Sequence, residues 1–134
     1  MIVLDAAAVV DVVLDQSAKE WVLGRLDGHA VCAPAHQPAE VLSALACLQR
    51  AGDIDEDVAR EALQEARELN QELVLPTAAG VVRAFELRGR IRVLDGLYVA
   101  LAEERACPLI TTDRRLAGSQ PPCELLWPGG SASS

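Results

Sequence analysis

No Cys-x-x-Cys pair occurs in the sequence, and no cysteine and histidine residues stand at zinc-finger spacing, so a structural zinc module is excluded. We interpret the four cysteines as buried thiols that pack as small apolar residues: Cys32, Cys47, Cys107 and Cys123. The sequence also lacks a basic start followed by an apolar stretch, and no apolar run approaches the length of a membrane span. These absences predict a cytoplasmic protein with reduced thiols and no membrane segment.

Basic residues are scarce as well. The 12 Lys and Arg residues stand against 20 Asp and Glu residues, which gives a formal net charge of −8. This balance argues against a broad nucleic-acid-binding surface, which is usually basic. Positive charge is nevertheless gathered next to two of the acids discussed below: Arg88, Arg90, Arg92, Arg114 and Arg115. We expect these arginines to form a basic rim that binds an RNA backbone. Arg88, Arg90 and Arg92 alternate along the chain, so an extended stretch at residues 88–92 would place their side chains on one side. Ordinary surface charge is the alternative explanation.

Apolar residues are plentiful, at 51% of the chain, and the length of 134 residues suits one domain with its own core. Short apolar runs alternate with helical patterns, which predicts an α/β fold. We expect a three-layer sandwich in which a short, mainly parallel central sheet is flanked by helices. The expected strands are residues 2–4, 30–33, 73–75, 108–111 and 124–127. The domain is expected to span residues 1–127, followed by a flexible Gly- and Ser-rich tail at residues 128–134.

Polar residues mark the expected starts of several helices. Ser17, with Glu20 three residues later, has the pattern of a capping box. Asp53 or Asp55 is expected to cap a helix that ends near residue 70, and Thr77 to cap the helix that follows.

Four acids adjoin these segments: Asp5, Glu40, Asp95 and Asp113. Asp5 and Asp113 each follow a predicted strand, whereas Glu40 and Asp95 lie in the first turns of predicted helices. In parallel sheets, sites form beyond the carboxyl ends of the strands, at the point where strand order reverses. If the two strands are neighbours at that point, the carboxylates of Asp5 and Asp113 meet there.

Converging acids repel one another, and a divalent cation removes that conflict. Ligands that are all oxygen indicate Mg²⁺ or Mn²⁺. We expect Asp5 and Asp95 to be direct ligands, and Asp113 to complete the site directly or through water. Glu40 is expected to orient the attacking water or to help remove its proton. The pattern therefore predicts a metal-dependent enzyme that acts on phosphoesters.

Each acid also has a purely structural explanation. Asp5, Asp95 and Asp113 can each cap the helix that follows, and a glutamate such as Glu40 is favoured by the helix dipole. Tyr98 is interpreted as a core residue, with base stacking as its alternative. His29 and His36 lack acid or cysteine partners at ligand spacing, so we expect no metal role for them.

The sequence resembles the PIN-domain nucleases in four segments. These are MIVLDA at residues 1–6, AEVLSAL at 39–45, LDGLYVALA at 94–102 and LITTDRRL at 109–116. All four occur in the order and spacing of the family, and the resemblance extends from Met1 to about Trp127. The length of the chain matches the VapC toxins of bacterial toxin–antitoxin pairs.

The resemblance implies a PIN-like fold and a Mg²⁺- or Mn²⁺-dependent endoribonuclease, the toxin of a type II toxin–antitoxin module. It implies that Asp5, Glu40, Asp95 and Asp113 form the catalytic acidic quartet, supported by a hydroxyl from Thr111 or Thr112. It also implies a homodimer and a cognate antitoxin that holds the enzyme inactive. We expect these partners to cover apolar faces of the helices at residues 17–28 and 34–70.

One position departs from the pattern of the family. Relatives often carry Ser, Thr or Asn two residues after the first Asp, and this chain has Ala7. Loss of such a supporting hydrogen bond lowers metal affinity or activity by ~10–100-fold. The alternative function is therefore a catalytically weak or inactive PIN-fold module that binds RNA or an antitoxin without cleavage.

Two other phosphate-handling classes fit the sequence poorly. A response-regulator receiver domain needs a lysine late in the sheet, and the only lysine here is Lys19. A haloacid-dehalogenase-type phosphatase needs a second Asp two residues after the first, where this chain has Ala7.

Overall fold

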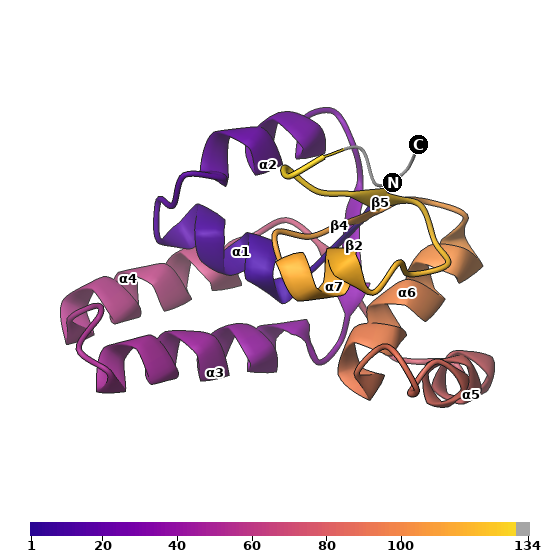
Figure 1. Ribbon diagram of the computed structural model, residues 1–134. Coiled ribbons are helices and arrows are strands. Elements are labelled where there is room, and N and C mark those ends of the chain that lie inside the picture. Colours follow the sequence, from indigo (N-terminus) through magenta and orange to yellow (C-terminus); the bar gives the residue numbers. More distant parts are fainter. Residues whose placement is uncertain (131–134) are drawn as a thin grey trace.

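The computed structural model describes residues 1–130, and within that range the chain forms five strands and seven helices (Figure 1). The strands are β1 (Ile2–Leu4), β2 (Val31–Pro34), β3 (Glu72–Val74), β4 (Leu109–Ile110) and β5 (Leu125–Leu126). The helices are α1 (Ala6–Val13), α2 (Lys19–Leu26), α3 (Gln37–Arg50), α4 (Glu56–Arg67), α5 (Ala78–Glu86), α6 (Val93–Arg105) and α7 (Arg114–Gly118).

The strands form one sheet in the order β3-β2-β1-β4-β5, and every neighbouring pair is parallel. Val3 in the central strand pairs with Cys32 of β2 on one side and with Leu109 of β4 on the other. The predicted parallel sheet is therefore confirmed. The first strand has its expected bounds, β2 and β3 are shifted by one residue, and β4 and β5 are each shorter by one residue at both ends.

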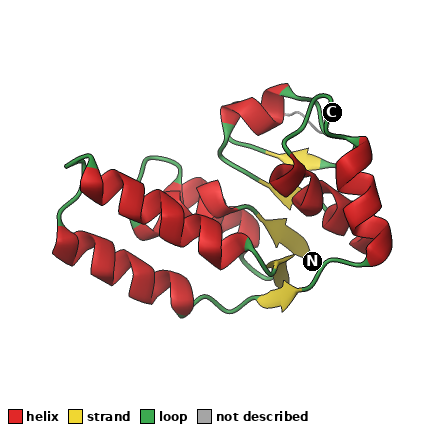
Figure 2. Cartoon of the chain, turned by 90° about the horizontal axis from the view of Figure 1, so that it is seen from below, coloured by secondary structure: helices red, strands yellow, loops and turns green. Residues whose placement is uncertain are grey.

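Helices cover both faces of the sheet, so the predicted three-layer sandwich is confirmed. Side chains of a strand alternate between the two faces. Ile2 and Leu4 accordingly pack with residues of α1 to α4, while Val3 packs with residues of α6 and α7. Figure 2 shows the two groups of helices on either side of the strands.

Strand order reverses between β1 and β4. The chain builds outward from β1 to β2 and β3, and then returns to place β4 and β5 on the other side. The backbone N–H of Asp5 donates to the carbonyl of Ile110 at 3.1 Å, so Asp5 lies at the carboxyl end of both central strands. The expectation that the strands before Asp5 and Asp113 are neighbours is confirmed.

The helix caps agree with the sequence in two places and differ in one. The Asp55 carboxylate accepts from the backbone N–H of Val58 at 2.8 Å, and the Thr77 hydroxyl accepts from that of Gly80 at 2.9 Å. The capping box predicted at Ser17 is wrong, because a turn occupies this position and α2 starts only at Lys19.

Within the described part of the predicted tail, Gly130 forms an isolated antiparallel bridge with Trp127. Residues 131–134 of the predicted tail lie outside the described residues. Within residues 1–130, no helix is both long and apolar enough to cross a membrane.

Helices α5 and α6 approach each other closely at Gly96. A Cβ atom built at this position lies 3.0 Å from the Cα of Ala84 and 3.1 Å from its Cβ. Because one of these atoms is backbone, a side chain at position 96 would force α5 to move. Gly96 directly follows Asp95, so this contact also sets where the Asp95 carboxylate lies.

Gly96→Ala is expected to lower the melting temperature by a few degrees. Overpacking costs ~1–3 kcal/mol, which exceeds the ~1 kcal/mol that alanine gains over glycine in a helix. Thermal unfolding followed by circular dichroism measures the change. Gly24→Ala in α2 is the matched control, since a Cβ there meets nothing within 4 Å. If both variants unfold at or above the wild-type temperature, the helix contact is looser than the distances imply.

Candidate active site

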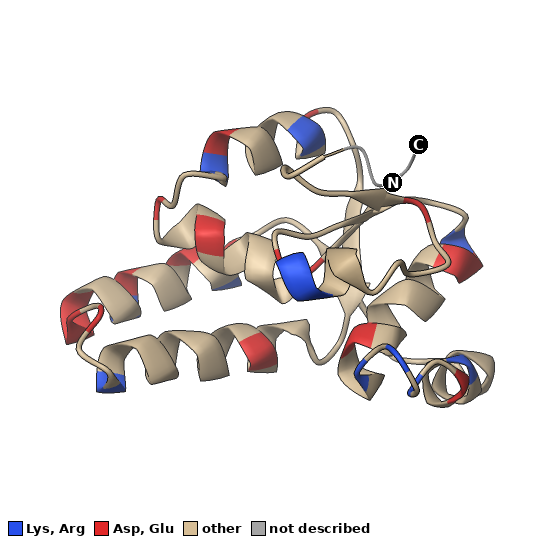
Figure 3. Cartoon of the chain, in the orientation of Figure 1, with Lys and Arg blue, Asp and Glu red and all other residues tan. Residues whose placement is uncertain are grey.

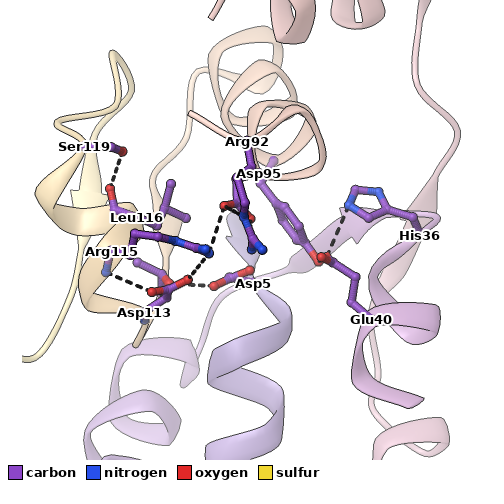
Figure 4. A network of polar contacts seen from close by, with 11 residues as sticks. Asp5, His36, Glu40, Arg92, Asp95, Asp113, Arg115, Leu116 and Ser119 are labelled. Carbon is purple, nitrogen blue, oxygen red and sulfur yellow. Dashed lines mark hydrogen bonds and ion pairs between the residues drawn. The ribbon is translucent and has the colours of Figure 1, made fainter. Parts of the chain in front are cut away.

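A pocket of about 300 Å³ lies beyond the carboxyl ends of β1 and β4. The structure brings the four acids singled out from the sequence together in its lining: Asp5, Glu40, Asp95 and Asp113. Asp5 follows β1, Glu40 comes from α3, Asp95 from α6, and Asp113 from the start of α7. Figure 4 shows Asp5, Asp95 and Asp113 side by side and Glu40 on the opposite side of the same opening.

Composition, rather than size, distinguishes this pocket. A larger hollow, of about 490 Å³, lies between Met1 and Leu126 and is lined by no Asp or Glu. Acidic residues also cover α4 (Figure 3), where most of them face solvent. The pocket at the switch point is therefore the candidate site.

Ala7 and Asp11 line the same pocket, and the sequence analysis gave Asp11 no role. These residues are four positions apart on α1, so they share one face of the helix. The four-residue spacing of Ala7 and Asp11, on the helix that directly follows Asp5, is the sequence signal that could have placed Asp11 at the site. No hydroxyl stands at position 7 to support the neighbouring carboxylates.

Asp5 is buried, with 4% of its surface exposed. It occupies the N-cap position of α1 but makes no side-chain cap hydrogen bond, so its carboxylate is not used as a cap. Instead, its Oδ2 accepts from the Thr111 hydroxyl at 2.6 Å. The pKa of Asp5 is raised to about 7, chiefly by burial and to a smaller extent by the nearby charges of Asp95, Glu40 and Asp113, while the Thr111 hydrogen bond acts in the opposite direction.

Thr111, rather than Thr112, contacts Asp5. Its side chain is fully buried, and its hydroxyl also accepts from the backbone N–H of Asp113 at 3.0 Å. One hydroxyl therefore joins the first and last acids of the pocket. The sequence did not distinguish Thr111 from Thr112, because the distinction depends on which of the two side chains after β4 points toward Asp5.

Asp95 is buried, with 5% of its surface exposed, and two arginines contact it. Arg92 donates to both carboxylate oxygens at 3.1 and 3.4 Å, and Arg115 approaches Oδ2 at 3.5 Å. Arg92, not Asp95, is the N-cap residue of α6, so the interpretation of Asp95 as a helix N-cap is wrong.

Asp113 does cap α7, as its structural explanation predicted. Its Oδ1 accepts from the backbone N–H of Arg115 at 2.9 Å, and its Oδ2 pairs with the Arg115 guanidinium at 3.0 Å. The Asp113 carboxylate still lines the pocket while it caps α7, so capping is compatible with a role in the site.

Glu40 makes contacts that the sequence analysis missed. The Tyr98 hydroxyl donates to Glu40 Oε1 at 2.7 Å, and His36 Nε2 lies 3.3 Å from the same oxygen. Burial alone would raise the pKa of Glu40, but the His36 and Tyr98 contacts and the charges of His36 and Arg92 outweigh it and lower that pKa. The four-residue spacing of His36 and Glu40 on one helix face was the available signal.

The five arginines do not form one continuous rim. Residues 88–92 were expected to be extended, and this is wrong: backbone N–H groups of Arg88 and Arg90 close turns onto the carbonyls of Phe85 and Leu87. The Arg88 guanidinium lies 3.9 Å from the centre of the Phe85 ring. Only Arg92 and Arg115 contact pocket acids, and Arg114 lines a separate hollow. Their role in RNA binding stays a prediction.

The donor chemistry of the pocket fits a hard divalent cation, since its acids offer only oxygen. Within residues 1–130, no three His, Cys, Asp or Glu side chains are arranged to hold one ion. The hydrogen bonds explain this: Asp95 and Asp113 point to arginines, Asp5 to Thr111 and Glu40 to Tyr98. The acids would have to leave these partners and turn toward one another to share an ion.

Comparison with known proteins gives a match to the PIN domain family over residues 2–118. Ribonuclease VapC3 of Mycobacterium tuberculosis is 41% identical over 123 residues, which cover 90% of this chain and 88% of that protein. Ribonuclease VapC12 of the same organism is 40% identical over 127 residues, which cover 89% of this chain and 92% of that protein.

Solved structures share the fold. The crystal structure of PAE2754 from Pyrobaculum aerophilum has a TM-score of 0.66 at 23% identity and covers 88% of this chain and 78% of that one. The structure of VapC20 from Mycobacterium tuberculosis, described as a toxin that cleaves the sarcin-ricin loop, has a TM-score of 0.65 at 13% identity, with coverage of 89% and 95%. At these identities the likeness concerns the fold alone.

Asp5→Asn is expected to stabilise the protein in EDTA above neutral pH by several degrees. The folded-state pKa of about 7 exceeds the ordinary value of 3.8, so the folded state binds the proton more tightly. Ionisation of Asp5 therefore reduces stability as the pH rises between these two values, and asparagine removes that penalty. The gain in melting temperature should be largest above about pH 7 and should vanish near about pH 4.

Asp53→Asn is the control, because Asp53 is an exposed acid in the turn between α3 and α4. It should leave the melting temperature nearly unchanged at every pH. A stabilisation by Asp5→Asn that is equally large at acid pH would show that the ionisation of Asp5 is not its cause.

Proposed function

The chain belongs to the PIN-domain family, and on that premise we propose that it is a metal-dependent endoribonuclease of the VapC type. One observation carries the proposal: four carboxylates from separate elements line one pocket at the switch point of the sheet. The relatives named as VapC ribonucleases, at 40–41% identity over about nine-tenths of this chain, support RNA as the substrate. An RNA substrate also supports the cytoplasm as the place of action.

Asp5, Asp95 and Asp113 would hold Mg²⁺ or Mn²⁺. When bound, the ion would supply positive charge at the phosphate and increase the acidity of water. The buried position of Asp5 and Asp95 supports this assignment, because buried carboxylates without a full set of positive partners gain most from a cation.

Glu40 would accept the proton of the attacking water. The pKa of Glu40 lies below its ordinary value, so the carboxylate is ionised at neutral pH, which is the form that can accept a proton. Arg92 and Arg115 would neutralise the phosphate of the RNA, since both guanidinium groups are more than half exposed and lie at the edge of the pocket.

The alternative is a PIN-fold module that binds RNA or an antitoxin without cleavage. Ala7 in the pocket lining is the observation that favours it, because no hydroxyl at this position can support a ligand. The Thr111 hydroxyl, just after the neighbouring strand β4, is bonded to Asp5 and supplies such support, which favours the active enzyme.

We further propose two partners, a cognate antitoxin and a second copy of the chain. Both partners were expected on the helices at residues 17–28 and 34–70, where the larger exposed apolar residues are Leu23, Leu42 and Val58. The apolar exposure on α5 is denser, with Val81, Val82 and Phe85 each more than half exposed. This density supports α5 as the surface that a second copy covers.

Asp95→Asn is expected to reduce cleavage of single-stranded RNA in Mg²⁺ or Mn²⁺ by at least about 100-fold, because it removes a charged ligand. Circular dichroism should show an unchanged fold. Wild-type activity should disappear in EDTA and return when Mn²⁺ is added in excess. Cleavage that persists in EDTA would contradict the metal requirement, and a wild-type chain that binds RNA but never cuts it would support the inactive alternative.

Phe85→Glu is expected to convert a dimer into a monomer at micromolar concentration, because a charge at the centre of an apolar contact cannot be solvated. Sedimentation velocity measures the mass. Val58→Glu on α4, also an exposed apolar residue, is the matched control and should leave the dimer intact. A monomeric wild-type chain would refute this part of the proposal.

A further inference from the structure

We infer that Tyr98, assisted by His36, is a positioning residue that holds the Glu40 carboxylate in the orientation needed to accept a proton in the pocket. The inference rests on the proposed function for its role in catalysis. The arrangement itself rests on contacts of this chain that involve neither RNA nor a metal ion.

Tyr98 is fixed by packing. It is fully buried in the core cluster formed by α6, β1 and β4, with Val99 and Leu101 as neighbours on its helix. A buried tyrosine hydroxyl needs a hydrogen-bond partner. Here that partner is Glu40 Oε1, at 2.7 Å, on a helix from the opposite face of the sheet. The hydroxyl therefore links the rigid core to a side chain in the pocket lining.

His36 contacts both members of this pair. Its ring meets the Tyr98 ring edge-on, with centroids 5.0 Å apart and an angle of 69° between the planes. Its Nε2 lies 3.3 Å from Glu40 Oε1, short of good hydrogen-bond geometry, and is buried without any other partner in the described chain. A dashed line marks this contact in Figure 4. Glu40 is thus the group that this buried nitrogen faces.

The start of α3, which carries His36 and Glu40, is anchored next to Asp5. Gln37, which is buried, donates to the carbonyl of Leu4 at 3.2 Å and exchanges hydrogen bonds with Gln71. The first turn of α3 is therefore tied to the end of β1. With the backbone held in this way, the Glu40 carboxylate moves toward or away from Asp5 mainly by rotation about its own side-chain bonds. The contacts with Tyr98 and His36 restrict that rotation.

Both contacts fall on one oxygen. Tyr98 and His36 face Oε1, and Oε2 has no protein hydrogen bond within residues 1–130. A carboxylate held by one oxygen presents the lone pairs of the other in a fixed direction. Oε2 is therefore the atom that accepts the proton.

The first experiment uses the fact that Tyr98 is the only tyrosine in the chain. Incorporation of 3-fluorotyrosine places a single fluorine beside the hydroxyl, and its ¹⁹F resonance reports on the hydrogen bond. In EDTA, without RNA, this resonance should show a titration step at acid pH as Glu40 gains a proton. The step should disappear in Glu40→Gln, a control that separates it from any effect of the nearby Asp5 carboxylate. A resonance with the same titration in both proteins would overturn the inference.

The second experiment removes the hydroxyl. Tyr98→Phe keeps the ring, and we expect kcat to fall about tenfold, with KM and Mn²⁺ affinity unchanged, as for loss of a partner that orients a reacting group. The acid limb of the kcat–pH profile should move to higher pH, because the hydrogen bond that favours ionised Glu40 is lost. In a Glu40→Gln background, Tyr98→Phe should have no further effect. An equal loss in both backgrounds would assign Tyr98 to packing.

Thr77→Val is the matched control, because the Thr77 hydroxyl also donates to a glutamate, Glu104, away from the four acids. It should leave kcat and its pH profile unchanged. His36→Phe, which keeps an aromatic ring but removes Nε2, should act in the same direction as Tyr98→Phe.

The two proposals fail in different ways. If the wild-type chain never cleaves RNA, the proposed function is wrong, while the ¹⁹F titration still tests the contact between Tyr98 and Glu40. If the chain cleaves RNA and Tyr98→Phe retains the wild-type kcat and pH profile, the positioning role is wrong and the function stands. Should Tyr98→Phe fail to fold, the fluorotyrosine experiment decides alone.

Discussion

Electrostatic repulsion among buried carboxylates is the constraint around which this molecule is arranged. Asp5 and Asp95 are each about 95% buried, and Asp113 and Glu40 share their pocket. Bringing ionised acids out of water and close together is unfavourable unless each finds a partner. The partners come from different parts of the chain: Thr111 for Asp5, Arg92 for Asp95, Arg115 for Asp113 and Tyr98 for Glu40. The fold brings these segments to the same edge of the sheet.

The sequence was sufficient for the fold and for the convergence of the four acids on one pocket. Each strand is a short apolar run, and the acids follow strands or open helices, so the parallel topology determines where their carboxylates point. The sequence stated only as a condition that the strands before Asp5 and Asp113 are neighbours, and the sheet order, with β1 beside β4, meets that condition. The role of each acid is not fixed by such a pattern, and the sites assigned here remain predictions to be tested by mutation.

The sequence was insufficient where a contact depends on tertiary geometry. Tyr98 lies among apolar neighbours on α6, and nothing in its local sequence indicates that its hydroxyl reaches α3. The turns at residues 88–92 replaced the extended stretch expected there, since α5 ends only at Glu86 and the chain must reverse before α6. The apolar face of α5 was likewise missed, because a helical pattern shows which side is apolar but not whether another element covers it.

The hydrogen-bond partners of the four acids also differ in charge, and this difference distinguishes Asp5 from the other three acids. Asp95 and Asp113 contact guanidinium groups, and Glu40 receives a hydroxyl hydrogen bond beside an imidazole, whereas the carboxylate of Asp5 bonds to a neutral hydroxyl. A cation entering the pocket would therefore gain most at Asp5, where it competes with no arginine. At Asp95 the same ion would have to displace the guanidinium of Arg92. The Arg92 side chain so released is more than half exposed, so under the proposed function ion binding would free a positive charge for an RNA phosphate, and the two binding events would favour each other.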